Sequence, residues 1–249
     1  MILASFDFES TGINPNEDRI REVGLALYST GRERILEQTS FLVTDTDKVM
    51  EGEAAEVSRI DQDMANRFGY TQADAVEACA EYFSAADAVI GHNITWFDSP
   101  LLRNTAKRLG LALPEKIGVD TMTDIPGIKG EALVKMCANA RDPKTGRDVS
   151  FTYEKHCALD DAKAVLRLIL WHDLDGIMAR AVSPTFVALS HQANSKATNK
   201  VAKKAGFRWN PDFRVWWQGV KECDFDKLKS SVPFDISITK DYSLEVLRD

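Results

Sequence analysis

Short apolar runs bounded by turn residues mark the first part of the chain. Such runs are typical of strands, and we expect strands at Ile2–Phe8, Glu22–Tyr28 and Ile35–Val43. The turn Ser29–Arg32 joins the second and third runs, which predicts an antiparallel meander.

Helical periodicity alternates with further short runs along the chain. Thr71–Phe83 predicts an amphipathic helix, and Ala88–Ile90 and Ile117–Val119 predict strands. Two more helices are expected from apolar stripes made by Leu101, Leu102, Ala106 and Leu109, and by Ala162, Val165, Leu166, Ile169 and Leu170. Strands and helices in this order predict an α/β architecture in which helices flank a mixed sheet.

The pattern changes after about Ser183. A helix is expected at Ser195–Ala205, followed by a β-hairpin that turns at Asn210-Pro211-Asp212. Further strands could lie at Asp235–Thr239 and Ser243–Leu247. We therefore expect a first domain at residues 1–180 and a small, basic, Trp-rich α+β domain at residues 185–249.

Composition is ordinary for a soluble globular protein, with 44% hydrophobic and 28% charged residues among 249. No apolar run approaches the roughly 20 residues of a membrane span, and the N-terminal run contains two acids instead of the basic start of a signal peptide. The four cysteines lack Cys-x-x-Cys spacing, which argues against a zinc site or a disulfide framework. They suit a reducing cytosol, so we expect a cytoplasmic protein.

Asp7 and Glu9 lie at the end of the first predicted strand. Side chains alternate along a strand, so both acids point to the same face. Neighbouring carboxylates at the end of a buried strand repel each other unless a cation or a proton compensates, which makes them candidate metal ligands. The alternative is that both lie beyond the sheet edge in water.

Two later fragments carry further candidates. Asp98 falls in the first turn of a predicted helix, where an acid can bind a metal or simply stabilise the helix end. Asp161 borders the apolar stripe of the last long helix while Asp160 is rotated away, so we favour Asp161 as the inward acid. His156 stands at the start of that helix, and the alternative is a solvated acid pair beside a helix-start histidine. His92 lies in a predicted turn, where we expect a surface residue.

Three short motifs follow from these fragments. They are Asp7-Phe8-Glu9-Ser10-Thr11-Gly12, then Gly91-His92-Asn93 with Phe97-Asp98, then His156 followed after four residues by Asp161. In this order they resemble the motifs of the DnaQ-like, or DEDD, family of 3′–5′ exonucleases, in its histidine variant (DEDDh). The resemblance covers about residues 1–175 and implies the ribonuclease H-like fold, with a mixed five-stranded sheet. One departure is Ser58-Arg59-Ile60, where members often have His-Gly-Ile, and it bears on helix geometry more than on chemistry.

The resemblance implies phosphodiester hydrolysis from a 3′ end with two divalent cations, Mg²⁺ or Mn²⁺. Asp7 would bridge both ions, and Glu9 and Asp161 would help to hold the ion that carries the attacking water. Asp98 would act on the second ion or through water, and His156 would be the general base. The family's substrate contacts fall on Ser10, Thr11, Gly12 and Ile13 at the 3′-terminal nucleotide, and on Asn93 and Phe97.

The tail of the chain is basic although the chain as a whole is acidic. Residues 193–221 hold seven Lys and Arg against one acid, a local charge of +6, which leaves −13 for the rest of a chain whose net charge is −7. Such an asymmetry often marks contact with nucleic acid. Phe207, Trp209 and Trp216 could stack on single strands, but we favour most of them as the core of the small domain. The candidate substrate contacts here are then Lys203, Lys204 and Arg208.

We therefore expect a 3′–5′ exonuclease that releases 5′-mononucleotides, with single-stranded DNA or 3′ overhangs favoured over RNA, in a DNA-repair setting. The alternatives are a 3′–5′ exoribonuclease, a proofreading subunit bound to a polymerase, and an inactive nucleic-acid-binding scaffold. All five catalytic positions are present, which disfavours the scaffold. Expected partners are nucleic-acid 3′ ends and a polymerase or repair protein, and the oligomeric state stays open.

Overall fold

The computed structural model of the 249-residue chain describes residues 1–44, 60, 62–125, 132–192, 195–211 and 214–239. The chain divides into two compact units, Met1–Met178 and Ala179–Asp249, which are described separately below. The strand expected at Ser243–Leu247 and most of the element Ser58-Arg59-Ile60 lie outside the described residues.

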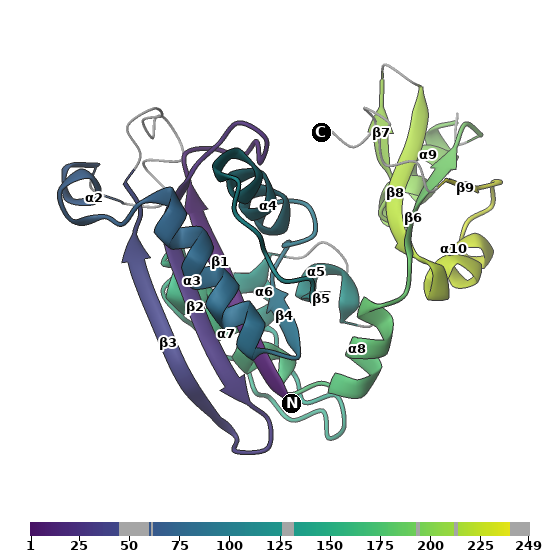
Figure 1. Ribbon diagram of the computed structural model, residues 1–249. Helices are drawn as coiled ribbons and strands as arrows, with labels where there is room; N and C mark the ends of the chain where they lie inside the picture. The colour runs from purple at the N-terminus through teal and green to yellow at the C-terminus, as the bar shows by residue number, and fades with distance from the viewer. Residues whose placement is uncertain (45–59, 61, 126–131, 193–194, 212–213, 240–249) are drawn as a thin grey trace. The chain divides into compact units, whose positions relative to one another are not determined.

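The first unit is built on a mixed five-stranded sheet (Figure 1). Its strands are β1 (Ile2–Ser10), β2 (Ile20–Ser29), β3 (Arg34–Leu42), β4 (Ala88–Gly91) and β5 (Ile117–Asp120), in the order β3-β2-β1-β4-β5. The first three strands form an antiparallel meander, and β1, β4 and β5 run parallel. This ribonuclease H-like sheet confirms the predicted fold class and brings the carboxyl ends of β1, β4 and β5 to one edge.

Helices flank this sheet. The core under α3 (Gln72–Ala85) and α4 (Asp98–Leu109) contains apolar residues of β1 and β2, and α7 (Ala158–Ile169) packs on the same two strands from the other face. The shorter helices described here are α2 (Gln62–Phe68), α5 (Thr121–Asp124), α6 (Leu133–Ala138) and α8 (Leu174–Ala181). The sequence pattern does not predict α2, α5 or α6, each of which has only four to seven residues.

The predicted apolar stripe of α4 is buried except at its last residue. Leu109 shares the predicted stripe with Leu101, Leu102 and Ala106, but it is 44% exposed while those three are buried. Gly110 adopts a left-handed conformation with φ of 68° and ends α4 directly after Leu109, so this last residue extends past the core.

The second unit contains a four-stranded antiparallel sheet with the strand order β7-β8-β6-β9. Its strands are β6 (Thr185–Ser190), β7 (Arg208–Asn210), β8 (Val215–Lys221) and β9 (Ser237–Thr239), and its described helices are α9 (Lys196–Lys204), the 3-10 helix η1 (Glu222–Asp224) and α10 (Phe225–Ser231). The helix, the hairpin and the strand at Ser237–Thr239 lie where the sequence predicts them, whereas β6 and α10 were not predicted.

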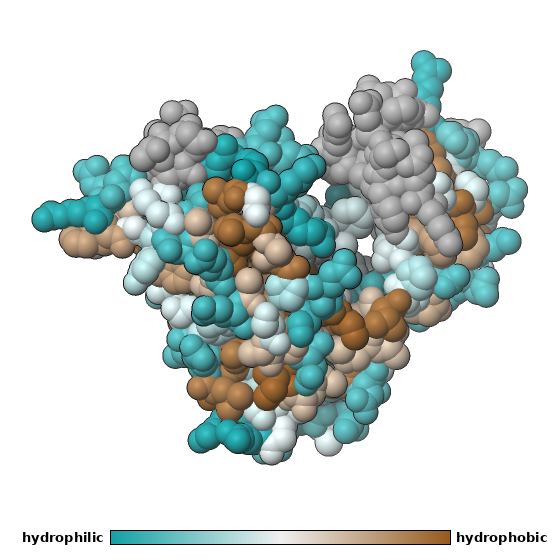
Figure 2. Space-filling model, in the orientation of Figure 1, coloured by the Kyte–Doolittle hydropathy of each residue, from teal (hydrophilic) through white to brown (hydrophobic). Residues whose placement is uncertain are grey.

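Apolar and polar residues are interspersed on the surface that Figure 2 shows for each unit. Within the part of the chain that the structure describes, every helix is too short or too polar to cross a bilayer.

Candidate metal-binding active site

Alternation along β1 separates its apolar side chains from its acids. Phe6 is fully buried in the core shared with α3 and α4, whereas Asp7 and Glu9 lie on the face that α7 covers. Ser5 marks the same face, because its hydroxyl donates to the carbonyl oxygen of Ala162 in α7 at 2.8 Å. β1 therefore presents two carboxylates to the start of α7.

A glycine on β2 lets α7 approach the sheet closely. A Cβ added to Gly24 would lie 2.1 Å from the carbonyl carbon of Ala158, the first residue of α7. The helix then carries Asp161 to the end of β1, where single oxygens of Asp7, Glu9 and Asp161 all lie within 4.8 Å of one another. Three converging carboxylate oxygens are a suitable donor set for a hard divalent cation.

The neighbouring acid Asp160 is directed elsewhere. Its Oδ1 forms an ion pair with Lys163 Nζ at 3.1 Å, and both side chains are more than a third exposed. The structure thus places Asp161, and not Asp160, among the converging carboxylates.

Asp98 approaches the same region from α4. It is only 4% exposed, and its Oδ1 accepts a hydrogen bond from the backbone N–H of Phe8 at 3.2 Å. That bond holds Asp98 against the strand that carries Asp7 and Glu9. Asp98 therefore lies next to the converging oxygens of Asp7, Glu9 and Asp161 but is not one of those three residues.

The segment before α7 is tied to Asp161. The backbone N–H of His156 donates to Asp161 Oδ2 at 2.9 Å, and the hydroxyl of Tyr153 donates to Asp161 Oδ1 at 2.6 Å. His156 has φ of 64°, a left-handed conformation that non-glycine residues adopt only with support from their surroundings. The histidine expected to act as general base is therefore anchored through its backbone to one of the carboxylates.

Burial and mutual repulsion raise the pKa values of the carboxyl groups at this site. Burial first, and then the charges of Asp98 and Asp161, raise the pKa of Asp7 well above its usual value. Burial and the charge of Asp161 raise the pKa of Glu9 to about 7, and burial raises the pKa of Asp98 to about 8. Burial also raises the pKa of Asp161. Such a group requires either protons or a cation, which is the electrostatic setting of a divalent-metal site.

The residues expected to contact a 3′-terminal nucleotide lie in the turn after β1. The hydroxyl of Ser10 donates to the carbonyl oxygen of Gly12 at 2.6 Å. Thr11 is buried and its hydroxyl donates to Asp18 Oδ1 at 2.8 Å. Ile13, in contrast, is 93% exposed. The turn is thus fixed internally by Asp18, which sequence reasoning missed, while Ile13 extends into solvent.

Asn93 and Phe97 lie in the turn between β4 and α4, and Asp120 shapes that turn. Asp120 is fully buried at the end of β5, and its carboxylate accepts hydrogen bonds from the backbone N–H groups of Asn93 (2.8 Å), Thr95 (3.0 Å) and Met122 (3.0 Å). The sequence pattern predicts only the strand Ile117–Val119 that precedes Asp120. An acid directly after a strand that runs parallel to β1 is the signal that could have identified it.

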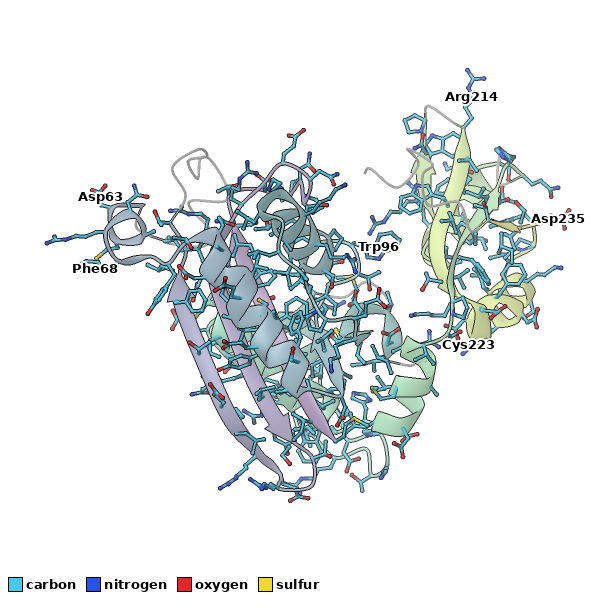
Figure 3. The ribbon with its side chains drawn as sticks, viewed as in Figure 1. Asp63, Phe68, Trp96, Arg214, Cys223 and Asp235 are labelled. Atoms are coloured by element: carbon cyan, nitrogen blue, oxygen red, sulfur yellow. The ribbon has the colours of Figure 1, made fainter. Side chains whose placement is uncertain are left out.

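His92 in the same turn is not a simple surface residue. It is half-buried, and its Nδ1 lies 2.9 Å from the hydroxyl oxygen of Thr121. The expectation of an exposed histidine was wrong, because β5 and α5 pack beside this turn. Trp96, four residues farther along, is also half-buried (Figure 3).

The basic residues expected to contact substrate lie in the second unit, on two faces of its sheet. Lys203 and Lys204 are exposed on α9, whose Ala202 shares a core with Trp216. The guanidinium of Arg208 lies 5.7 Å from the ring centre of Trp217, on the opposite face from Trp216. The structure therefore does not bring Arg208 together with the two lysines.

The aromatic residues of this unit divide between core and surface. Phe207 and Trp216 are buried, in agreement with a structural role. Trp209 lies with its ring centre 5.5 Å from that of Trp216 but is 44% exposed. Arg214 projects outward beside the connection between β7 and β8 (Figure 3).

A mixed sheet with carboxylates from β1, α4 and α7 gathered beside a histidine is the arrangement of a DnaQ-like exonuclease domain. Comparison with protein families agrees, because residues 5–169 match the exonuclease family RNase_T. The chain belongs to this exonuclease family.

Solved structures with the same fold include several of exonuclease I. The zinc-bound complex of E. coli exonuclease I with single-stranded DNA aligns with a TM-score of 0.59 and 16% identity over 76% of this chain and 48% of that chain. Exonuclease I from Methylocaldum szegediense gives 0.54 and 17% over 80% and 49%, and a further exonuclease I structure gives 0.57 and 14% over 80% and 50%. The chain thus spans about half the length of these proteins, and identities this low establish the fold alone. Comparison with curated proteins found no match.

The raised carboxyl pKa values predict that the metal-free protein loses stability as the pH rises from about 5 to about 8. Glu9 and Asp98 titrate near pH 7 and 8 in the folded state but near ordinary carboxyl values when unfolded. The folded state therefore binds more protons in this window, and deprotonation favours unfolding. The measurement is the thermal unfolding midpoint against pH, with EDTA or with excess Mg²⁺. Mg²⁺ should raise the midpoint most at the alkaline end, and a midpoint that responds to neither pH nor Mg²⁺ would contradict this account.

Asp120→Ala should lower the free energy of unfolding by about 2–3 kcal/mol, because it removes the acceptor of three backbone N–H groups around a buried position. Asp120→Asn is the matched control, since it keeps one acceptor oxygen and the same size, and it should cost less. Urea unfolding of both variants tests this, and an equal, small loss in both would show that the carboxylate does not hold the turn.

Proposed function

We propose that this chain is a metal-dependent 3′–5′ exonuclease that hydrolyses nucleic acid to 5′-mononucleotides, with single-stranded DNA or 3′ overhangs as its favoured substrates. The observation that carries the proposal is the convergence of Asp7, Glu9 and Asp161 oxygens within 4.8 Å, beside Asp98 and His156, in a chain of the exonuclease family.

The site suits two hard divalent cations, Mg²⁺ or Mn²⁺. Its donors are carboxylate oxygens, which favour such ions over softer metals. The raised pKa values of these carboxyl groups indicate that the site is short of positive charge. Asp7 would be shared by both ions, Glu9 and Asp161 would hold one of them, and Asp98 would serve the other. When bound, two cations offset the negative charge of the phosphodiester and of the leaving oxygen.

The protein's own groups supply the remaining chemistry. The imidazole of His156 would accept the proton of the attacking water as general base. Its backbone bond to Asp161 keeps it beside the carboxylates. The ordered turn at Ser10, Thr11 and Gly12 offers backbone groups to the 3′-terminal nucleotide, and the exposed Ile13 can lie against its base.

Support for single-stranded DNA comes from the small unit and from one structural relative. Lys203 and Lys204 place two exposed charges on α9, and exposed Trp209 offers a stacking surface. The E. coli exonuclease I structure of the same fold is a complex with single-stranded DNA. Asn93 and Phe97 would support the second motif from the turn before α4.

Substitution of the two adjacent acids of α7 tests the catalytic assignment. Asp161→Ala should lower the rate of 5′-mononucleotide release by more than about a hundredfold, because it removes a metal ligand. Asp160→Ala removes a neighbouring acid that pairs with Lys163 and should leave the rate nearly unchanged. Near-normal release of 5′-mononucleotides by purified Asp161→Ala would contradict the assignment of Asp161 as a metal ligand.

The same assay distinguishes the substrates. End-labelled single- and double-stranded DNA and RNA would be compared with Mg²⁺ or Mn²⁺, and single-stranded DNA should be shortened fastest, from its 3′ end. Faster degradation of RNA would favour an exoribonuclease, and activity that appears only with an added polymerase would favour a proofreading subunit.

Reversing the charge of Lys203 and Lys204 together to Glu should raise KM for long single-stranded DNA. It should also reduce the slope of log affinity against log salt concentration by about 1.4. Each of the two phosphates that a lysine no longer neutralises accounts for about 0.7 of this change. Hydrolysis of a p-nitrophenyl nucleotide ester, too short to reach a second site, should keep its rate. The matched control reverses Lys227 and Lys229, two exposed lysines on α10 of the same unit. Equal effects from both pairs would show that α9 has no specific role.

A further inference from the structure

Tyr153 is not part of any motif in the chain, yet its hydroxyl lies in the candidate active site. It donates to Asp161 Oδ1 at 2.6 Å, and the backbone N–H of His156 donates to Asp161 Oδ2 at 2.9 Å. Each oxygen of the carboxylate thus accepts one bond from the same short segment. A carboxylate oxygen has two lone-pair sites, so these bonds leave acceptor capacity on both oxygens for a cation.

The position of Tyr153 is set by packing and not only by that hydrogen bond. Its ring lies 6.5 Å from the ring of buried Phe151. The backbone N–H of Phe151 donates to the carbonyl oxygen of Cys137 in α6 at 3.1 Å. The guanidinium of Arg167, on α7, lies 4.1 Å from the ring centre of Phe151. The segment is therefore attached to two helices, one of which also carries Asp161.

We propose that Tyr153 is a positioning residue for the metal site: its hydroxyl holds the Asp161 carboxylate in the orientation that faces Asp7 and Glu9, and with it the left-handed backbone at His156. The proposal rests on the proposed metal-dependent function. Ligating carboxylates are commonly oriented by such outer hydrogen bonds, and losing one typically weakens metal binding by about ten- to a hundredfold.

The test is Tyr153→Phe, which removes one hydroxyl and keeps the ring. Tyr70→Phe is the matched control, because Tyr70 is exposed and its ring packs on Phe41, away from the carboxylates. The first readout is Mn²⁺ affinity, from the electron paramagnetic resonance signal of free Mn²⁺ titrated with full-length protein. Tyr153→Phe should weaken Mn²⁺ binding by about tenfold, with Tyr70→Phe unchanged.

A second readout separates positioning from a direct role. In kinetics on single-stranded DNA, Tyr153→Phe should lower kcat and raise the Mn²⁺ concentration needed for half-maximal rate, with KM for DNA unchanged. In an Asp161→Ala background, Tyr153→Phe should have no further effect on the remaining Mn²⁺ binding, because the hydroxyl acts through that carboxylate.

The outcomes separate this proposal from the proposed function. If the wild-type protein degrades nucleic acid and Tyr153→Phe binds Mn²⁺ within about twofold of the wild-type affinity, the positioning role alone is overturned. Wild-type protein that binds Mn²⁺ more tightly than Tyr153→Phe but degrades no nucleic acid supports the positioning role and overturns the exonuclease. Wild-type protein that binds no Mn²⁺ overturns both.

Discussion

The candidate active site depends on how closely the first turn of α7 packs on the sheet. The absence of a side chain at Gly24 lets the backbone of Ala158 lie where any Cβ would collide with it. From that contact, one helical turn carries Asp161 to the end of β1, where strand alternation has already placed Asp7 and Glu9 on the same face. Backbone packing, and not attraction between the side chains, therefore gathers the carboxylates.

This arrangement of carboxylates is electrostatically unfavourable in the metal-free protein, and the same repulsion favours the binding of a cation. Burial and repulsion raise the pKa values of Asp7, Glu9 and Asp98, so the site without a cation favours protons. A divalent cation would replace the protons and remove the repulsion, and metal binding would then be coupled to the stability of the fold. The apolar packing of Phe6 and its neighbours on the opposite face of β1 is what holds the acids in place against their repulsion.

The parts of this site that the sequence predicts are those governed by a regular period. Two-residue alternation relates Asp7 to Glu9, and helical phase separates Asp161 from Asp160. Asp120 and Tyr153 have no such period. Asp120 ends β5, a strand whose place in the sheet depends on the whole fold, and Tyr153 lies in an irregular segment. The acid after the run Ile117–Val119 marks Asp120 as a candidate, but its three backbone N–H donors cannot be predicted from spacing. The contact of Tyr153 with Asp161 cannot be predicted from spacing either. The strand β6 was also not predicted, and the exposure of Leu109 is decided by the end of α4, which the apolar stripe alone does not give.

Net charge is a poor guide to whether this chain can bind a polyanion. At physiological ionic strength the field of an exposed charge is screened within about 8 Å, so a phosphate group responds to the groups it meets and not to the total of −7. The acids with the largest effect on a phosphate at the site are those whose negative charge bound cations would offset, namely Asp7, Glu9, Asp98 and Asp161. The exposed lysines of α9 lie in the second unit, in a segment whose local charge is +6. An acidic chain can therefore carry a locally basic segment, and two bound divalent cations would offset the charge of the four carboxylates in the first unit.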